Sequence, residues 1–236
     1  MKFPFDLTMR PFRQPLPYPR PSEMQVYYPL ESQTIIGAKQ KDIVGEKEGT
    51  VSATLTGGKI GAGLQFNGIG QYFDTNYSPD ILADGELTIA FWVKGAPGAT
   101  GVILGLGNVF DDTTWNRLQF NWSTPKMRMY TKGDDENVRL YTTTATLLDN
   151  AFHSVVGIIS PKENETLVYV DSVYDGGAAG ALGAFSFEGW TIHGGCLNND
   201  GVRGNYAAGF LDELMIVNKR WSPRQVEAYH YGRLLE

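Results

Sequence analysis

The sequence predicts an all-β protein in which two antiparallel sheets pack as a sandwich or jelly roll. Short segments in which apolar and polar residues alternate recur from about residue 24 onward. The 236 residues include 28 glycines, which suit many tight turns and argue against a helical protein. No helical pattern of about 10–15 residues recurs between the strands, so parallel β-α-β units are not expected.

The clearest strand is GELTIAFWVKG, residues 85–95. Its apolar side chains share one face, which we expect to point into the space between the sheets, opposite residues 152–158 and 210–217. These side chains are Leu87, Ile89, Phe91 and Val93. Further strands are predicted in NRLQFNWS, KMRMYT, NVRLYTT, HSVVGIIS, ETLVYVDSV and FLDELMIVN. Turns between strands are predicted at Asn67-Gly68, Asp84-Gly85, Gly133-Asp134, Asp175-Gly176 and Asp200-Gly201.

One helix is predicted near the C-terminus, in RWSPRQVEAYHYGRLL. Ser222 is a favourable N-cap, Pro223 suits the first helical position, and Gln225 completes a capping box. The apolar side chains that follow share one side, so we expect a short helix lying on the edge of the sandwich.

Residues 1–23 do not fit this pattern and are predicted to form an extended arm next to a domain spanning residues 24–236. Six of the 12 prolines fall in the first 21 residues, and proline fixes φ and removes a backbone donor. Residues 1–22 carry a formal charge of +3 and the rest of the chain −9, which together give −6. We expect the arm to hold another subunit of a large assembly through Phe3, Phe5, Arg10, Phe12, Arg13, Tyr18 and Arg20.

Three stretches, in this order, resemble the concanavalin A-like lectin/glucanase superfamily, specifically its laminin-G-like jelly-roll modules. They are GGKIGAGLQFNGIGQYFDT with the strand ELTIAFWVKG, then FHSVVGIISPKENETLVYVDSV, then GFLDELMIVNKRWSPRQVEAYHYG. Ser172 stands where the family usually has a glycine. The resemblance covers about residues 25–236, and the arm has no counterpart in it. It implies a concanavalin A-like jelly roll of two antiparallel sheets, glycan or protein binding at loop edges, and in some members a calcium ion.

Little in the sequence favours an enzyme. Glycoside hydrolases on this fold need two carboxylates facing one cleft, and their usual Glu-x-Asp-x-x-Glu signature does not occur. Asp212 and Glu213 are adjacent, so on a regular strand they point to opposite faces and cannot form a catalytic pair. We expect one of them to satisfy backbone or turn donors at the sheet edge. The three histidines lack metal-ligand spacing, and the single cysteine, Cys196, is expected to be a small buried residue.

Glycan binding needs exposed aromatic faces beside hydrogen-bonding groups. Two groups of residues are candidates: Trp115 with Asp111, Asp112 and Asn116, and Trp190 with Tyr206 and Asn199 of the loop LNNDG. The alternative is that these aromatic side chains cover core edges or lie in a subunit interface.

A calcium ion is the one cofactor that the sequence suggests, because acidic and amide-rich loops offer oxygen ligands. The candidate ligands are Asp111, Asp112, Asn199 and Asp200. The loop GDDEN has the same character. Ordinary hairpin turns are the alternative for all these loops, because turns are made of the same residues.

The function that we favour from the sequence is a non-enzymatic structural and interaction protein of a virus or bacteriophage particle, in capsid decoration or in the tail. The first residues contain no apolar run of signal-peptide length, which predicts synthesis in the host cytoplasm. We expect the protein to assemble into the virion as a homo-oligomer. The alternative is a free lectin-like carbohydrate-binding module that leaves the cell by a non-classical route. The two coexist if a decorating protein adheres to host glycans.

The bulk properties exclude two other classes of partner. A formal charge of −6 gives no reason to expect nucleic-acid binding, which usually shows as a basic face. No stretch approaches the ~20 apolar residues of a membrane span, so membrane insertion is not expected.

Overall fold

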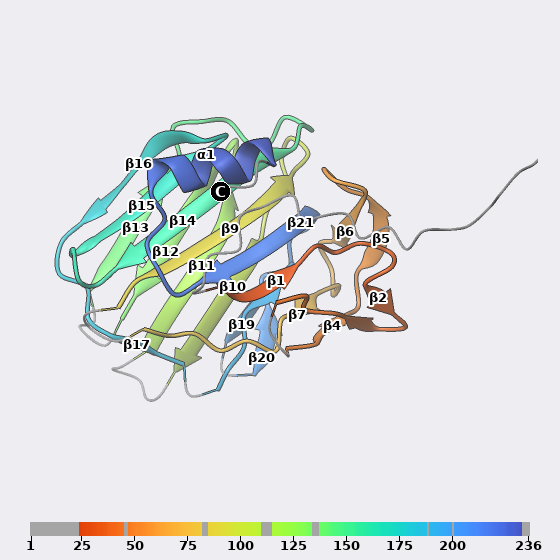
Figure 1. Ribbon diagram of the computed structural model, residues 1–236, viewed down its shortest axis with the longest axis horizontal. Coiled ribbons are helices and arrows are strands. Elements are labelled where there is room, and N and C mark those ends of the chain that lie inside the picture. Colours follow the sequence, from red (N-terminus) through yellow and green to blue (C-terminus); the bar gives the residue numbers. More distant parts are fainter. Residues whose placement is uncertain are drawn as a thin grey trace, which may run out of the picture.

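The computed structural model describes residues 24–44, 47–81, 85–109, 115–133, 137–187, 189–199 and 201–232. These residues form the predicted all-β sandwich of two sheets, with one short helix near the C-terminus (Figure 1). Among the described residues, no helix has the length and apolar character that crossing a membrane requires.

The first sheet has eight strands in the order β16-β15-β14-β9-β21-β6-β5, with β1 also paired to β21. The bounds are Met24–Tyr28 (β1), Thr54–Gly57 (β5), Ala62–Asn67 (β6), Leu87–Lys94 (β9), His153–Ser160 (β14), Glu165–Val170 (β15), Val173–Ala179 (β16) and Ala208–Val217 (β21). All pairings in this sheet are antiparallel.

The second sheet has 11 strands in the order β13-β12-β11-β10-β18-β7-β4-β3-β2, extended by β19 beside β10 and β20 beside β19. The bounds are Ile35–Ile36 (β2), Lys39–Gln40 (β3), Gly49–Val51 (β4), Phe73–Asp74 (β7), Val102–Val109 (β10), Trp115–Ser123 (β11), Lys126–Lys132 (β12), Val138–Thr142 (β13), His193–Gly194 (β18), Leu197–Asn199 (β19) and Val202–Gly204 (β20). The short pairing of β10 with β19 is parallel. A separate two-stranded ribbon pairs β8 (Asp80–Ile81) with β17 (Phe185–Ser186).

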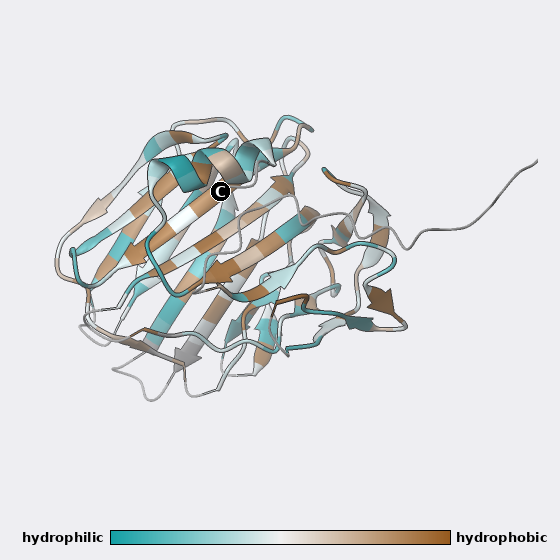
Figure 2. Cartoon of the chain, viewed as in Figure 1, coloured by the Kyte–Doolittle hydropathy of each residue, from teal (hydrophilic) through white to brown (hydrophobic). Residues whose placement is uncertain are grey.

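The main hydrophobic core lies between the two sheets and contains the apolar face that the sequence predicts for β9, namely Leu87, Ile89, Phe91 and Val93. Residues 152–158 and 210–217 are expected opposite this face. They instead contribute to β14 and β21, which flank β9 in the same sheet. The opposite wall is the second sheet, whose Phe120 packs edge to face on Phe91 with ring centroids 5.1 Å apart. Figure 2 shows hydrophobic and hydrophilic residues alternating along several of these strands.

Helix α1 (Pro223–Tyr231) begins as predicted, with Ser222 and Gln225 forming a capping box. It does not lie on the sandwich edge but on the outer face of the first sheet. The reason is that β9 also carries large apolar residues on its second face, where Trp92 is only 1 % exposed. Tyr229 of the helix stacks on this indole with centroids 6.4 Å apart, so the helix closes a second, smaller core.

One predicted turn is wrong. Asp175-Gly176 lies within β16, and the hairpin between β15 and β16 turns instead at Asp171 and Ser172, whose φ angles are 49° and 68°. Two successive residues at positive φ are typical of a tight hairpin turn. Ser172 therefore adopts the left-handed conformation for which glycine is the usual residue.

Candidate functional site

The adjacent acids Asp212 and Glu213 lie at a bulge in β21, where the pairing with β9 shifts register and Glu213 has a φ of 53°. The strand is therefore not regular here, and the two carboxyl groups do not point to opposite faces as a regular strand would require. Asp212 accepts the backbone N–H groups of Lys59 and Ile60 at 2.8 and 3.0 Å. Glu213 accepts the hydroxyl hydrogen of Tyr27 on the side covered by α1.

Both acids are structural. Their side chains belong to residues only 0 % and 1 % exposed, so a substrate cannot reach them. Burial raises the pKa of Asp212 to about 7, and burial with the neighbouring Asp212 carboxyl raises the pKa of Glu213 to about 9. The prediction that one acid satisfies backbone donors is confirmed for Asp212, although β21 is a central strand and not an edge.

A serine, a histidine and an aspartate meet on the outer face of the first sheet beside α1, but they do not form a nucleophilic triad. Ser154 Oγ lies 2.8 Å from Nδ1 of His230, and Asp171 lies 3.9 Å from the same nitrogen. In a triad the base contacts the serine and the aspartate through different nitrogens. Ser154 is also only 2 % exposed.

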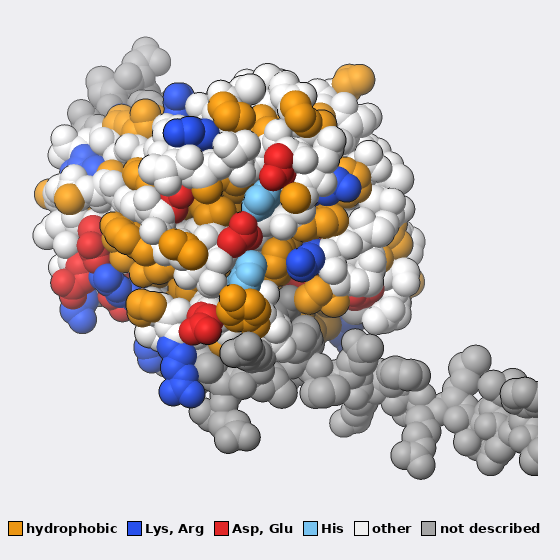
Figure 3. Space-filling model, turned by 90° about the horizontal axis from the view of Figure 1, so that it is seen from above, with side chains coloured by type: hydrophobic (Ala, Val, Ile, Leu, Met, Phe, Trp, Pro, Cys, Tyr) orange, Lys and Arg blue, Asp and Glu red, His pale blue; other side chains and the backbone are white. Residues whose placement is uncertain are grey.

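Asp171 instead links neighbouring elements on this surface through hydrogen bonds. It contacts Nδ1 of His153 at 2.7 Å and accepts the backbone N–H of Ser154 at 3.0 Å. Its hydrogen bond with His153, together with the one from Asp149, raises the pKa of that imidazole. Figure 3, a view from above, shows histidine and acidic side chains lying among hydrophobic ones. The arrangement braces the β15–β16 turn against β14.

The first predicted glycan-binding group lies mostly outside the described residues, because Asp111 and Asp112 fall in the segment 110–114. The backbone of Trp115 opens β11 opposite Val109. Asn116 is only 6 % exposed. The residues predicted for the arm, Phe3, Phe5, Arg10, Phe12, Arg13, Tyr18 and Arg20, also lie outside the described residues.

The second predicted group is partly brought together. Trp190 is half-buried against the core, and a Cβ on Gly201 would lie 2.6 Å from its ring, so this indole packs on the LNNDG loop. The amide oxygen of Asn199 lies close to Gly107: a Cβ on Gly107 would be only 2.8 Å from this oxygen. Tyr206 instead forms an isolated bridge with Val102. Trp190 thus covers an edge of the core, as the alternative interpretation expects.

Calcium stays a prediction. Three of its candidate ligands, Asp111, Asp112 and Asp200, lie outside the described residues. Within the described ranges, no three His, Cys, Asp or Glu side chains are grouped closely enough to hold a metal ion.

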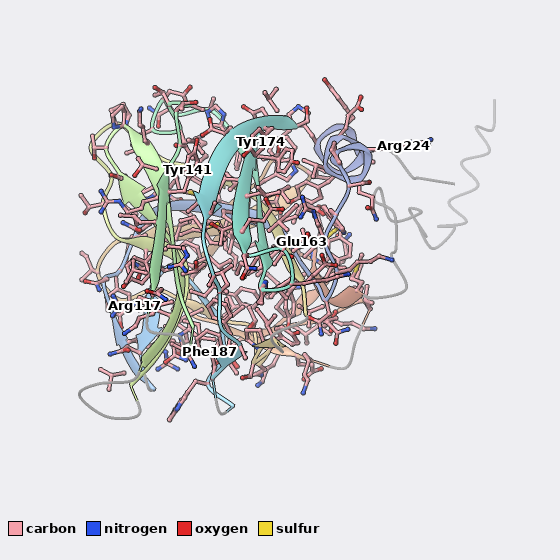
Figure 4. The ribbon with its side chains drawn as sticks, turned by 90° about the vertical axis from the view of Figure 1, so that its left-hand side faces the viewer. Arg117, Tyr141, Glu163, Tyr174, Phe187 and Arg224 are labelled. Atoms are coloured by element: carbon pink, nitrogen blue, oxygen red, sulfur yellow. The ribbon has the colours of Figure 1, made fainter. Side chains whose placement is uncertain are left out.

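The outer face of the second sheet carries a row of hydrogen-bonding side chains that sequence reasoning did not single out. In β11 the apolar residues join the core, so the alternate residues Arg117, Gln119 and Asn121 point outward. Figure 4 shows Arg117 on this outer side. Gln119 has Tyr130 of β12 on one side and Gly105 of β10 on the other. We call this surface the polar face and define it as Arg117, Gln119, Asn121, Arg128 and Tyr130.

His193 follows across β10, opposite Gly105, but it is only 2 % exposed. It belongs to a compact cluster at this end of the sheet, which we call the Tyr72 cluster. Its members are Tyr72, Asp74, Thr191, His193 and Arg203. Tyr72 and Asp74 flank the buried Phe73, so an alternating aromatic and acid in QYFDT was the signal available in the sequence.

Hydrogen bonds set the tautomer of His193. Its Nδ1 accepts the Nε–H of Arg203 at 3.3 Å, and its Nε2 lies 3.3 Å from Oδ2 of Asp74. An imidazole nitrogen that accepts carries no proton, so the proton is on Nε2 and points at the Asp74 carboxylate.

Asp74 is held as a carboxylate. Burial alone would raise its pKa, but hydrogen bonds from His193, from the Thr191 hydroxyl at 2.6 Å and from the Asn76 N–H at 2.9 Å outweigh it. The pKa of Asp74 is lowered to about 2. Asp74 is therefore ionised throughout the neutral range.

Aromatic contacts complete the Tyr72 cluster. The Tyr72 ring stacks on His193 with centroids 5.6 Å apart, and the guanidinium carbon of Arg203 lies 4.0 Å from the Tyr72 centroid. Cys196 lies behind them, fully buried, with Sγ 3.6 Å from Nδ1 of His193. Burial raises the pKa of this thiol to about 12, so it is the inert buried residue that the sequence predicts.

Comparisons with known proteins agree with this architecture. A family model described as the concanavalin A-like lectin/glucanases superfamily matches residues 67–227. No curated protein matches the sequence. The binding domain of Paraclostridial Mosquitocidal Protein 1 superposes with a TM-score of 0.68 at 11% identity, over 88% of this chain and 52% of that one. The botulinum neurotoxin serotype G binding domain gives 0.67 at 9% identity, over 87% and 50%.

A third similar structure is domain 4 of AbnA, an extracellular arabinanase of Geobacillus stearothermophilus, in complex with arabinotriose. It superposes with a TM-score of 0.56 at 16% identity, over 87% of this chain and 97% of that one. The chain thus spans about half of each toxin binding domain and nearly all of the arabinanase domain. At these identities the likenesses show the fold.

Proposed function

The chain belongs to the concanavalin A-like lectin/glucanases superfamily, and we propose that it is a non-catalytic module that binds a glycan on its polar face. The observation that carries this proposal is the outward row in which Tyr130 and Gln119 are paired on neighbouring strands, with Gly105 beyond Gln119. An aromatic ring beside fixed hydrogen-bonding groups is what sugar recognition needs.

The spacing of the row favours an extended ligand. From Tyr130 in β12 to Arg203 in β20 the surface crosses four strand spacings, β12 to β11, β10, β19 and β20. At ~4.8 Å for each spacing, it spans roughly 19 Å. An oligosaccharide fits this length better than a single sugar, and its hydroxyl groups can be shared among successive strands.

The known neighbours support binding over catalysis. Two are described as toxin binding domains, and the arabinanase domain is described in complex with arabinotriose. One similar structure is a mutant of Trypanosoma rangeli sialidase displaying trans-sialidase activity, but this chain covers only 33% of it. The buried state of Asp212 and Glu213 also argues against hydrolysis by that pair.

A glycan array followed by titration calorimetry tests the proposal. We expect wild-type protein to retain at least one oligosaccharide and Tyr130→Ala to bind it about tenfold more weakly, or about 1.4 kcal/mol. Tyr174→Ala is the matched control, because this tyrosine is 56 % exposed on β16 of the other sheet. Equal affinity of both variants, or no glycan retained by wild type, would contradict the proposal. Thermal unfolding verifies that both variants are folded.

A second candidate function is the structural role in a virus or bacteriophage particle. It rests on the composition of residues 1–23, which are rich in proline and basic. If this role holds, deletion of residues 2–22 leaves the domain folded but abolishes its joining an assembly or oligomer. Normal assembly of the truncated protein would rule it out. The two functions are compatible, since one uses the arm and the other the polar face.

A further inference from the structure

We propose that the glycan carries a carboxylate and that the guanidinium of Arg203 binds this group end-on. The inference rests on the proposed function and names the class of ligand: an acidic oligosaccharide. The inference follows from which parts of the Arg203 guanidinium already have partners in the Tyr72 cluster and which do not.

Two parts of the Arg203 guanidinium are already engaged. Its Nε–H donates to Nδ1 of His193 at 3.3 Å, and its flat face lies 4.0 Å from the centroid of the Tyr72 ring. The terminal nitrogens Nη1 and Nη2 are left over, and no described residue accepts a hydrogen bond from them. Arg203 is exposed, so this end of the guanidinium is open to a ligand.

Asp74 does not neutralise Arg203. Its carboxylate is occupied by His193, Thr191 and the Asn76 N–H, and no ion pair joins it to the guanidinium within the described residues. Asp74 acts on Arg203 only through His193, because it holds the imidazole proton on Nε2 and leaves Nδ1 to accept. The network therefore positions a cation and leaves its charge available.

The geometry selects for a carboxylate. Two parallel N–H groups match the two oxygens of a carboxylate, and such charged, bidentate pairs are about twice as strong as neutral hydrogen bonds. A sugar hydroxyl can use only one of the two donors. Lysine could not replace Arg203, because an ammonium has neither the planar fork nor the flat face that stacks on Tyr72.

Matched ligand pairs provide the test. Trigalacturonate, a hyaluronate tetrasaccharide and 3′-sialyllactose are each titrated beside their methyl esters, which keep the sugar rings and lose the charge. We expect wild type to bind at least one acid about tenfold more tightly than its ester. Arg203→Lys and Arg203→Ala should abolish this preference while leaving the affinity for the ester unchanged. Arg224→Ala, an exposed arginine on α1, should change neither.

His193 is inferred to be a positioning residue. His193→Phe keeps an aromatic ring against Tyr72 but removes the acceptor for the Nε–H of Arg203. We expect it to lower the preference for the acid, with an unchanged affinity for the ester. Unchanged preference in this variant would show that the imidazole does not orient the guanidinium.

The outcomes separate this inference from the proposed function. If wild type binds neutral glycans or the esters as tightly as the acids, the carboxylate inference is wrong and glycan binding stands. If an acid is preferred but Arg203→Ala keeps the preference, Arg203 is not its site. If no saccharide binds, both proposals fail.

Discussion

The hydroxyl of Tyr141 in β13 lies 2.7 Å from Oδ1 of Asp175 in β16, and this contact joins the edge strands of the two sheets. Asp175 also accepts the N–H groups of Thr144 and Ala145, at 2.7 and 3.0 Å. Gly176 leaves room for the tyrosine, since a Cβ there would lie 2.3 Å from its hydroxyl oxygen. Figure 4 looks onto this side of the sandwich, with Tyr141 labelled.

Asp175→Ala should lower the free energy of unfolding by about 1–3 kcal/mol, because several donors lose one acceptor. Glu163→Ala is the control, since Glu163 is exposed. It should stay within about 0.5 kcal/mol of wild type. Urea unfolding measures both. An equal loss of unfolding free energy in both variants would show that Asp175 does not stabilise the contact between the two edge strands.

Phe91→Ala should cost about 3–5 kcal/mol, because the ring is fully buried and packs on Phe120 of the opposite sheet. Val173→Ala, at a site 67 % exposed, serves as the control for loss of apolar volume. Chemical denaturation of both variants is the measurement. A cost under about 1 kcal/mol for Phe91→Ala would mean that the ring is not in the core.

Ser222→Ala should destabilise α1 by about 1 kcal/mol, because the side chain caps the backbone N–H of Gln225. Ser222→Asp should retain most of the stability, since aspartate is an equally good N-cap and its charge suits the helix N-terminus. Thermal unfolding of the two variants gives the comparison. Equal destabilisation by both would show that the cap contributes nothing specific.

Glu213→Gln should flatten the dependence of stability on pH. Burial raises the pKa of Glu213 to about 9, whereas an unfolded glutamate titrates near ~4.3. The folded state thus keeps a proton that the unfolded chain releases, so stability is greatest below about pH 4 and falls as the pH rises toward 9. One such group contributes a slope of up to about 1.4 kcal/mol per pH unit.

Unfolding by urea at about pH 5, 7 and 9 measures this slope. Glutamine keeps a neutral acceptor for the Tyr27 hydroxyl and removes the titration of this side chain, so the slope loses the share of Glu213 and keeps that of Asp212. An unchanged slope in the variant would mean that Glu213 is ionised in the folded protein.

The sequence by itself determined the fold class, several of the longer strands and the helix start. Alternation along β9 predicted its core face, and the motif from Ser222 to Gln225 predicted where α1 begins. These features depend on geometry within a few residues: side chains alternate along a strand, and a capping box closes over one helical turn. A single sequence is sufficient for such local relationships.

Only the tertiary structure decided which faces meet and where a binding site forms. The helix covers the outer face of the first sheet because Trp92 needs burial there, which the strand pattern did not reveal. The Tyr72 cluster joins segments as distant as Asp74 and Thr191, which are 117 residues apart. Such contacts form because crossing connections bring β7, β18 and β20 to one end of the second sheet, and strand order is set by the packing of the whole sandwich.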